Sequence, residues 1–405
     1  MDLGVTAAMA ANTGRLEREG SRLLSLDVFR GVVIAGMILV TDPGTYSAVY
    51  WPLRHAEWNG ATPTDMIFPS FLVMVGMAMT LSFASRIARG GSRSRMFRHV
   101  LRRSAVLFVL GLLVNGFPDY DLHTLRIPGI LQRIAVCYLL GGSLYLLVSE
   151  VGVGQGRRVV RAVAVGGVLV ALLAGYWALL RWYPMPGFGA GRLDSLGNVA
   201  AYLDRWVFGV RHMWAYGLTP GYGVTFDPEG ILSTLTALAT LLMGVLAGEW
   251  MGTDRTRERK ALVLVGAGAA LAAIGYGLQP WLPLNKKMLT STFAMFSGGV
   301  ALMAFSLLYW VLDIRRWRGW EGPAMVLGTN AIFAFALSTV VTTMSDRIHV
   351  GGGDAGLTLH RWVYQVGFLP WLAPVRASLA YAIAIVVLNV ALVYPLYRRR
   401  VFLRV

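Results

Sequence analysis

Residues 53–69 read LRHAEWNGATPTDMIFP, a short polar interval between two long apolar runs. The interval holds one histidine, two acids, one amide and a tryptophan. Polar and ionisable groups this close to membrane-spanning segments are rare unless they have a function. We therefore interpret the flanking runs as membrane spans and expect the interval to carry the chemistry, with His55 at its centre.

The chain as a whole is far more apolar than a soluble domain. Apolar residues make up 56% and charged residues 14% of the 405 positions, and the mean hydropathy is +0.57. Because one span needs about 20 mostly apolar residues, the sequence predicts an all-α, polytopic bundle of about ten transmembrane helices. We expect these helices near 24–39, 65–85, 104–118, 128–149, 162–180, 230–250, 261–279, 288–312, 323–343 and 377–397.

The formal charge of +16 would suggest a nucleic-acid partner in a soluble protein. Here the basic residues cluster in short loops on alternate sides of the apolar runs, so we expect the lipid bilayer as partner and no nucleic acid. Residues 86–103 contain seven arginines and no acid. The positive-inside rule places this segment and both termini in the cytoplasm and the His55 loop on the opposite side.

The predicted domains are a cytoplasmic tail at 1–22 and one transmembrane domain at 23–405. Its outward loops are expected at 40–64, 181–229 and 344–376. No internal repeat indicates a transporter built from inverted halves. The single cysteine, Cys137, lies inside an apolar run and is predicted to be a buried packing residue.

His55 is the first candidate for catalysis, because a histidine can accept or donate a proton, or accept an acyl group, near neutral pH. The alternative is a capped interfacial histidine without chemistry. Asp65 also has two interpretations. With Thr62 as cap and Pro63 at the first position it fits the third position of a helix start, and it can instead orient His55 as a neighbouring carboxylate.

Other polar groups inside or beside the predicted spans need partners. Arg133 lies in the fourth span, where it requires either an ion pair with an acid such as Asp27 or Asp65, or an anion to bind. Asn330, in the ninth span, should point into the bundle. The remaining candidates for substrate or cofactor binding are Glu57, Trp58, Asn59, Lys286 and Lys287.

Taken together, the motifs resemble one known family. The segments SLDVFRG (25–31), RHAEWNG (54–60), TDMIFP (64–69), RIPGILQR (126–133), FDPEG (226–230), NKK (285–287) and GTNA (328–331) are similar in kind and order to the heparan-alpha-glucosaminide N-acetyltransferase family and its bacterial relatives.

The resemblance implies a membrane acetyltransferase that takes acetyl from cytosolic acetyl-CoA, without a metal, and delivers it to an amino sugar or other glycan on the far side. It implies that His55 is the acetyl acceptor, and a homodimer. The family has an asparagine at the end of the first span, whereas this chain has Thr41 followed by Asp42. Thr41 and Asp42 are therefore candidate replacements for that catalytic group.

Two chemistries remain open for His55, a covalent acetyl-histidine and general-base catalysis. Arg133 and Asn330 are candidates for stabilising the oxyanion. We expect a bacterial cytoplasmic membrane as the location, because the chain resembles the bacterial relatives and the acceptor would be a cell-envelope glycan. The competing function is a transporter or flippase for a glycan or a lipid-linked substrate.

Overall fold

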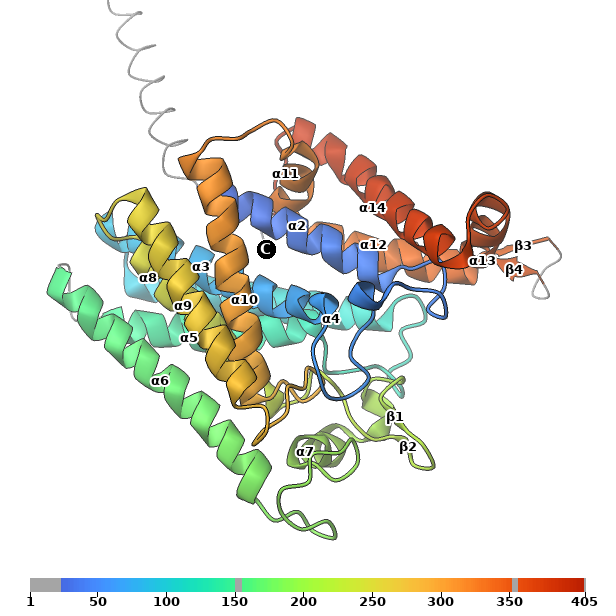
Figure 1. Cartoon of the computed structure of the whole chain (residues 1–405), viewed down its shortest axis with the longest axis horizontal. Helices are drawn as coiled ribbons and strands as arrows, with labels where there is room; N and C mark the ends of the chain where they lie inside the picture. Colours follow the sequence, from blue (N-terminus) through green and yellow to red (C-terminus); the bar gives the residue numbers. More distant parts are fainter. Residues whose placement is uncertain (1–22, 150–154, 352–355, 404–405) are drawn as a thin grey trace, which may run out of the picture.

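The computed structural model describes residues 23–149, 155–351 and 356–403, and these residues form a bundle of long helices (Figure 1). The predicted tail at 1–22 lies outside this part of the chain. The long helices are α2 (Leu24–Thr41), α3 (Ile67–Ala88), α4 (Arg93–Gly116), α5 (Ile130–Val148), α6 (Gln155–Trp182), α8 (Ser233–Met251), α9 (Arg257–Gly277), α10 (Ser291–Tyr309), α12 (Ala331–Arg347) and α14 (Pro374–Arg398).

Short elements occupy the connections. They are the 3-10 turns η1 (Trp51–Leu53), η2 (Pro63–Met66) and η4 (Val210–His212), the helices α7 (Val199–Phe208), α11 (Gly322–Thr329) and α13 (Leu359–Trp362), and the π-helical turns η5 (Trp310–Ile314) and η7 (Val363–Phe368). Two small antiparallel hairpins pair β1 (Leu218–Thr219) with β2 (Gly223–Val224) and β3 (His349–Val350) with β4 (Leu357–Thr358).

Within the described residues, eight helices are long and apolar enough to cross a membrane, and a ninth if the bent pair α11 and α12 counts as one span. The tenth predicted run is α4, whose first half carries five arginines and therefore lacks the uniform apolar composition of the others. The predicted all-α, polytopic fold is confirmed, and the chain is an integral membrane protein.

The bend in the ninth span lies at Asn330, where α11 and α12 meet at 91°. Asn330 is 1% exposed, so its amide does point into the protein. It donates to the carbonyl oxygen of Val401 at 3.2 Å and accepts from the amide of Leu403 at 2.8 Å. The side chain thus replaces backbone partners and ties the end of the chain to the broken helix.

Helices α3 and α8 lie at the centre of the bundle. In their spans 67% and 78% of the residues are buried, against 28% in α6, 28% in α9 and 22% in α14. The two helices touch through glycine: a Cβ on Gly76 would lie 2.1 Å from the carbonyl oxygen of Leu241, and one on Gly244 would lie 2.0 Å from that of Val73. Small residues permit this close backbone approach between membrane helices.

Successive long helices alternate in direction, so the connections gather at two ends of the bundle. One end, the His55 end, carries the loop between α2 and α3, the connection 183–232 with α7, β1 and β2, and the turn before α10 (Figure 1). The other end, the Arg86 end, carries the α3–α4 turn and the last residues of α14. Segments far apart in the sequence therefore meet around His55.

Candidate functional site

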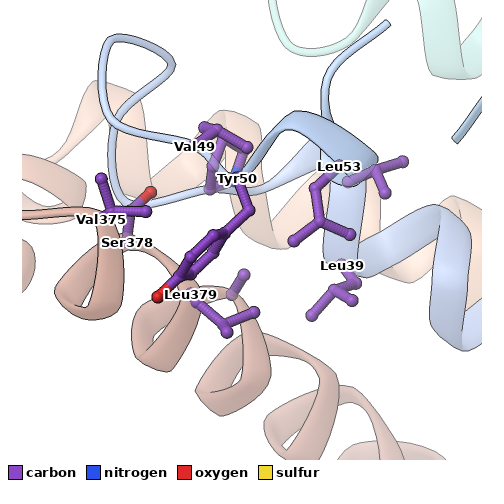
Figure 2. Close-up of a pocket in the computed structure, with 10 residues that line it drawn as sticks. Leu39, Val49, Tyr50, Leu53, Val375, Ser378 and Leu379 are labelled. Atoms are coloured by element: carbon purple, nitrogen blue, oxygen red, sulfur yellow. The ribbon is translucent and has the colours of Figure 1, made fainter. Parts of the chain in front are cut away.

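The loop that carries His55 is attached to α14 before it reaches the histidine. The amide of Gly44 donates to the carbonyl oxygen of Ser378 at 3.3 Å, and the amide of Thr45 donates to Ser378 Oγ at 3.2 Å. Figure 2 shows the ring of Tyr50 lying over α14 beside Leu379. Only about 10 Å³ of free space remains in this apolar contact, so the start of the loop is tightly packed.

The end of the loop is fixed by a capping box, as the sequence predicted. Thr62 precedes η2, Pro63 is its first residue and Asp65 its third. Oδ2 of Asp65 accepts from the amide of Thr62 at 3.0 Å and from the amide of Ala56 at 3.2 Å. Because Asp65 is fully buried, these donors hold its carboxylate in one orientation.

The same carboxylate also contacts His55. Oδ1 of Asp65 lies 2.7 Å from Nδ1 of His55. An ionised carboxylate only accepts, so Nδ1 carries the proton in this contact, and in the neutral imidazole Nε2 then carries the lone pair. The His55 side chain is 49% exposed, and Nε2 makes no hydrogen bond with any residue that the structure describes. Both interpretations of Asp65 are therefore realised in one side chain, which caps the helix and orients the histidine.

Lys286 completes this group, which we call the His55 cluster (His55, Asp65 and Lys286). Its Nζ lies 2.9 Å from Nδ1 of His55 and 3.4 Å from Oδ1 of Asp65. Since Nδ1 is already protonated, the ammonium is paired with the carboxylate rather than with the imidazole. Burial lowers the pKa of Lys286, and the charges of Asp65 and Glu229 oppose this shift.

The turn before α10 brings Lys286 to His55. The amide of Gly60 donates to the carbonyl oxygen of Leu284 at 2.7 Å, and Nδ2 of Asn285 donates to Oδ1 of Asn59 at 3.2 Å. Asn285 is fully buried and also caps its own turn by accepting from the amide of Met288 at 2.8 Å. Asn59, predicted as a binding residue, thus joins the two loops.

Trp58 and Lys287 lie next to the His55 cluster in the sequence motifs and both contact the ring of Phe226. The indole of Trp58 donates to the carbonyl oxygen of Leu193 at 2.8 Å and packs edge-on against Phe226, with 5.0 Å between ring centroids. Nζ of Lys287 lies 5.8 Å and 5.5 Å from these two centroids and donates to the backbone carbonyl of Glu57. The N–H group of the Trp58 indole is therefore already used in a hydrogen bond within the protein. Glu57, by contrast, is an exposed residue.

Thr41 and Asp42 lie in a different group of contacts. Thr41 Oγ1 donates to the carbonyl oxygen of Met37 at 2.7 Å, one turn earlier in α2. Oδ1 of Asp42 accepts from the Thr342 hydroxyl at 2.5 Å. Burial raises the pKa of Asp42 to about 6, although Thr342 and His360 oppose the shift. In the described part of the chain, neither residue hydrogen-bonds to the His55 cluster.

Arg133 pairs with neither of the acids expected from its sequence position. Its Nη2 donates to the carbonyl oxygen of Gly230 at 3.1 Å and to Ser233 Oγ at 2.5 Å. Asp27 instead pairs with Arg30 at 3.2 Å, and Asp65 belongs to the His55 cluster. The ion-pair alternative was wrong because a buried guanidinium can be satisfied by neutral acceptors, which spacing does not reveal, and the anion alternative stays a prediction.

Sequence reasoning also missed a buried ion pair close to the cluster. Arg126 Nε donates to Oδ2 of Asp227 at 2.9 Å and Nη2 donates to Oδ1 at 2.7 Å, and Glu229 accepts from the same nitrogen. Asp227 lies in the segment before α8, which begins at Ser233. The signal was present in the sequence, because Arg126 and Asp227 both lie in the motifs quoted above.

A cavity of about 330 Å³ opens at the Arg86 end. Its mouth is basic, with Arg30, Arg86, His99 and Arg103 among the lining residues. Deeper in, the walls are apolar, and Phe71, Ile134, Ala331 and Ile332 are shared with a much smaller cavity of about 10 Å³ that reaches Phe68. Phe68 follows Asp65 by three residues, so the apolar path points toward the His55 cluster.

Comparison with known proteins agrees with these motifs. Residues 22–174 match the family model described as "Heparan-alpha-glucosaminide N-acetyltransferase, catalytic", a segment that contains His55 and Asp65 but not Lys286. The heparan-alpha-glucosaminide N-acetyltransferase of Homo sapiens is 29% identical over 360 residues, which is 80% of this chain and 53% of that protein.

The Mus musculus protein of the same name is 27% identical over 352 residues, or 78% of this chain and 53% of that protein. The chain thus spans about half the length of the curated relatives it matches. The motifs, the family model and both alignments agree, and the chain is similar to the heparan-alpha-glucosaminide N-acetyltransferases.

Proposed function

We propose that this protein is a membrane-embedded acetyltransferase that moves acetyl from acetyl-CoA to an amino sugar or other glycan acceptor. The observation that carries the proposal is the pairing of a half-exposed His55 with a fully buried Asp65. A buried carboxylate that orients an accessible imidazole is the arrangement used for nucleophilic and general-base catalysis. The names of the two relatives support acetyl transfer as the reaction.

The donor would enter from the Arg86 end. Acetyl-CoA carries several phosphate charges, and the basic mouth with Arg30, Arg86 and Arg103 offers guanidinium groups for them. Its long thiol arm matches the apolar walls deeper in the cavity. The thioester would then approach the His55 cluster from inside the bundle, while the acceptor approaches from the exposed side of His55.

Two routes of acetyl transfer fit this geometry. In the covalent route, Nε2 of His55 attacks the thioester carbon, the C–S bond breaks and CoA leaves as a thiolate. The acceptor amine then attacks the acetyl carbon, the bond to Nε2 breaks and the amine proton passes to the thiolate. In the direct route, Nε2 takes the amine proton as the amine attacks the thioester, and then transfers it to the departing sulfur.

Asp65 and Lys286 have roles in both routes. Each route places positive charge on the imidazole, which the carboxylate 2.7 Å from Nδ1 stabilises. The Lys286 ammonium, 2.9 Å from Nδ1 of the same ring, is a candidate for stabilising the oxyanion. Arg133, with its Nη2 engaged by Gly230 and Ser233, and Asn330, engaged by the chain end, are less suited to that role.

The test is single-turnover transfer from acetyl-labelled CoA to glucosamine by purified protein. His55→Ala and His55→Gln should lower the rate at least a thousandfold, whereas His123→Gln, at an exposed loop histidine, should not. Equal rates in all variants would overturn the assignment to His55. Label on the protein without acceptor indicates the covalent route, and its absence under rapid quenching indicates the direct route.

We further propose that the His55 end is extracytoplasmic, in a bacterial cytoplasmic membrane, because the arginine-rich α3–α4 segment favours the opposite side. Thr124→Cys and Ser92→Cys place a thiol at an exposed position of each end, and the native Cys137 is buried. In intact cells an impermeant maleimide should label only the first variant. Uptake of a glycan by sealed vesicles without acetyl-CoA would favour the transporter alternative.

A further inference from the structure

A second large cavity, of about 370 Å³, lies between α5 and α8 and is distinct from the cavity at the Arg86 end. Phe108 of α4 and Phe208 of α7 close two of its sides. Its volume falls within the range of about 300–1,000 Å³ that is usual for ligand pockets. The cavity has no part in the mechanism described above.

The position of the cavity matches one leaflet of a bilayer. Its lining runs from Gly129, just before α5, to Leu140, and from Gly230, just before α8, to Leu238. At 1.5 Å per residue, the stretch of α5 from its start to Leu140 spans about 15 Å. This is about half of the ~30 Å hydrocarbon core, so the cavity reaches from the His55 end to the middle of the membrane.

The mouth of the cavity faces outward from the bundle. Leu140 and Ile231, at its edge, are 46% and 37% exposed. Leu140 lies on α5, and an apolar side chain with this exposure on a membrane helix faces the lipid phase rather than water, while Ile231 lies in the turn just before α8. The walls between them are mostly apolar, which suits an alkyl or isoprenyl chain.

Two buried polar side chains line the same cavity without full partners. Gln132 is 4% exposed, and both its Nε2 and its Oε1 lack a hydrogen bond within the described residues. Arg133 is 3% exposed, and its Nε is likewise unpaired there. Buried polar atoms without partners are destabilising, so a ligand head group that bound close enough to pair with these atoms would be stabilised by them.

The positive charge of Arg133 indicates which kind of lipid head group would bind in this cavity. The Nη2 of Arg133 meets only a carbonyl and a hydroxyl, so its positive charge has no carboxylate within ion-pair distance among the described residues. A guanidinium in this state is well suited to a phosphate, and a neighbouring amide can donate to a phosphate oxygen or a sugar hydroxyl. Glu229, which also lines the cavity, lies close enough to act on the charge of Lys286.

We propose that this cavity binds the lipid chain of a lipid-phosphate-linked acceptor, with the phosphate at Gln132 and Arg133 and the sugar directed toward His55. The proposal rests on the proposed function, because it names the acceptor of the same reaction. The cavity begins at the His55 end, so a lipid-anchored sugar would present its amine on the exposed side of the cluster.

Direct binding tests the cavity without reference to activity. Purified protein is incubated with dodecyl phosphate, or with inorganic phosphate, and retained ligand is measured by native mass spectrometry. We expect dodecyl phosphate to be retained and inorganic phosphate not. Leu235→Trp, which fills the cavity, should weaken retention at least tenfold, whereas Val170→Trp, on the exposed surface of α6, should not.

Gln132→Met keeps the length of the side chain and removes the unpaired amide, so it provides a second variant if Leu235→Trp folds poorly. It should weaken dodecyl phosphate binding about tenfold. Equal retention by wild type, Leu235→Trp and Gln132→Met would overturn the proposal. So would a change from dimer to monomer in Leu235→Trp with unchanged lipid binding, because the cavity would then be an interface between two copies.

An activity measurement separates this proposal from the proposed function. The ratio of kcat/KM for dodecyl-phospho-glucosamine to that for free glucosamine should exceed ten in wild type and in Val170→Trp, and should fall toward one in Leu235→Trp. A ratio near one in wild type overturns the lipid-linked acceptor while transfer itself stands. If neither acceptor is acetylated, the proposed function fails, and the binding measurement still decides whether the cavity holds a lipid.

Discussion

Oδ1 of Asp65 lies 2.7 Å from Nδ1 of His55, while Oδ2 of the same carboxylate closes the capping box at the start of η2. The first contact sets the tautomer of the histidine and the second prevents the carboxylate from rotating away. Because Asp65 is fully buried and His55 is half exposed, the reactive nitrogen is presented to the surface by a fixed internal group.

Asp65→Asn should separate the two roles of this residue. The amide can still accept from the Thr62 and Ala56 amides through its oxygen, so the protein should fold. Its NH₂ group would face Nδ1 and favour the wrong tautomer, so we expect the rate of acetyl transfer to fall by roughly 10²–10⁴-fold. Single-turnover kinetics with acetyl-labelled CoA measures this loss.

Thr62→Ala is the matched control, because it removes only the hydroxyl that donates to Oδ2 of Asp65 at 3.0 Å and leaves the contact of Oδ1 with His55 in place. It should lower the free energy of unfolding by about 1 kcal/mol and change the transfer rate far less than Asp65→Asn. A larger rate loss in Thr62→Ala than in Asp65→Asn would contradict the assigned roles.

Lys286 should control the alkaline limit of activity. Burial lowers its pKa, so its ammonium loses the proton at a lower pH than an exposed lysine would. If the charge of Lys286 stabilises the oxyanion, the rate of acetyl transfer should decline as the pH rises through the pKa of this lysine. Lys286→Arg keeps the charge and should move the decline to higher pH, and Lys286→Met should be slow at every pH.

Lys287→Met is the comparison, because Lys287 faces the rings of Trp58 and Phe226 and does not reach Asp65 within ion-pair distance. Its pH–rate profile should keep the shape of the wild type. An unchanged profile in Lys286→Arg would show that another group sets the alkaline limit.

Local sequence was sufficient for the cap and for most of the membrane spans, α4 being the exception. Thr62, Pro63 and Asp65 are close in the chain, and capping depends on chemistry within one turn. The apolar runs needed only their length and composition to predict an all-α bundle. Cys137 is buried as predicted, on the side of α5 that packs into the hydrophobic core.

Partners far apart in the chain could not be assigned in the same way. Lys286 is 231 positions from His55, and only the packing of the turn before α10 against Asn59 and Gly60 joins them. An acid was one of the two partners predicted for Arg133, the other being a bound anion, whereas the protein supplies a carbonyl and a hydroxyl. A catalytic role for Thr41 or Asp42 stays a prediction, since both residues make their contacts outside the cluster.

The contact between α3 and α8 predicts a strong effect of a single methyl group. A Cβ on Gly244 would lie 2.0 Å from the carbonyl oxygen of Val73, so Gly244→Ala must push the two central helices apart. We expect a loss of about 1–3 kcal/mol or more, seen as a lower unfolding temperature in detergent. Gly175→Ala, where no atom lies within 4 Å, should be neutral or slightly stabilising.

The raised pKa of Asp42 predicts that this residue makes the stability of the protein, rather than its catalysis, depend on pH. Burial raises its pKa from 3.8 to about 6, so the folded protein holds a proton on this carboxyl between these two values when the unfolded chain does not. The stability from this group is therefore complete below about pH 4 and is lost as the pH rises through about 6. Asp42→Asn should stabilise the protein at pH 7.5 by up to about 3 kcal/mol, seen as a higher unfolding temperature, and give no gain at pH 4.

The amide introduced by Asp42→Asn would keep an oxygen for the Thr342 hydroxyl, so the hydrogen bond at 2.5 Å is not the variable under test. The charges of His360 and Asp346 also act on Asp42, and these two residues pair with each other at 3.0 Å. Both residues are therefore left unchanged in the variants compared. Asp254→Asn changes an exposed carboxylate and is the control. Its unfolding temperature should differ between pH 4 and pH 7.5 by the same amount as that of wild type. Lower stability of Asp42→Asn at both pH values would mean that the ionised carboxylate is required by its neighbours, and would contradict the raised pKa.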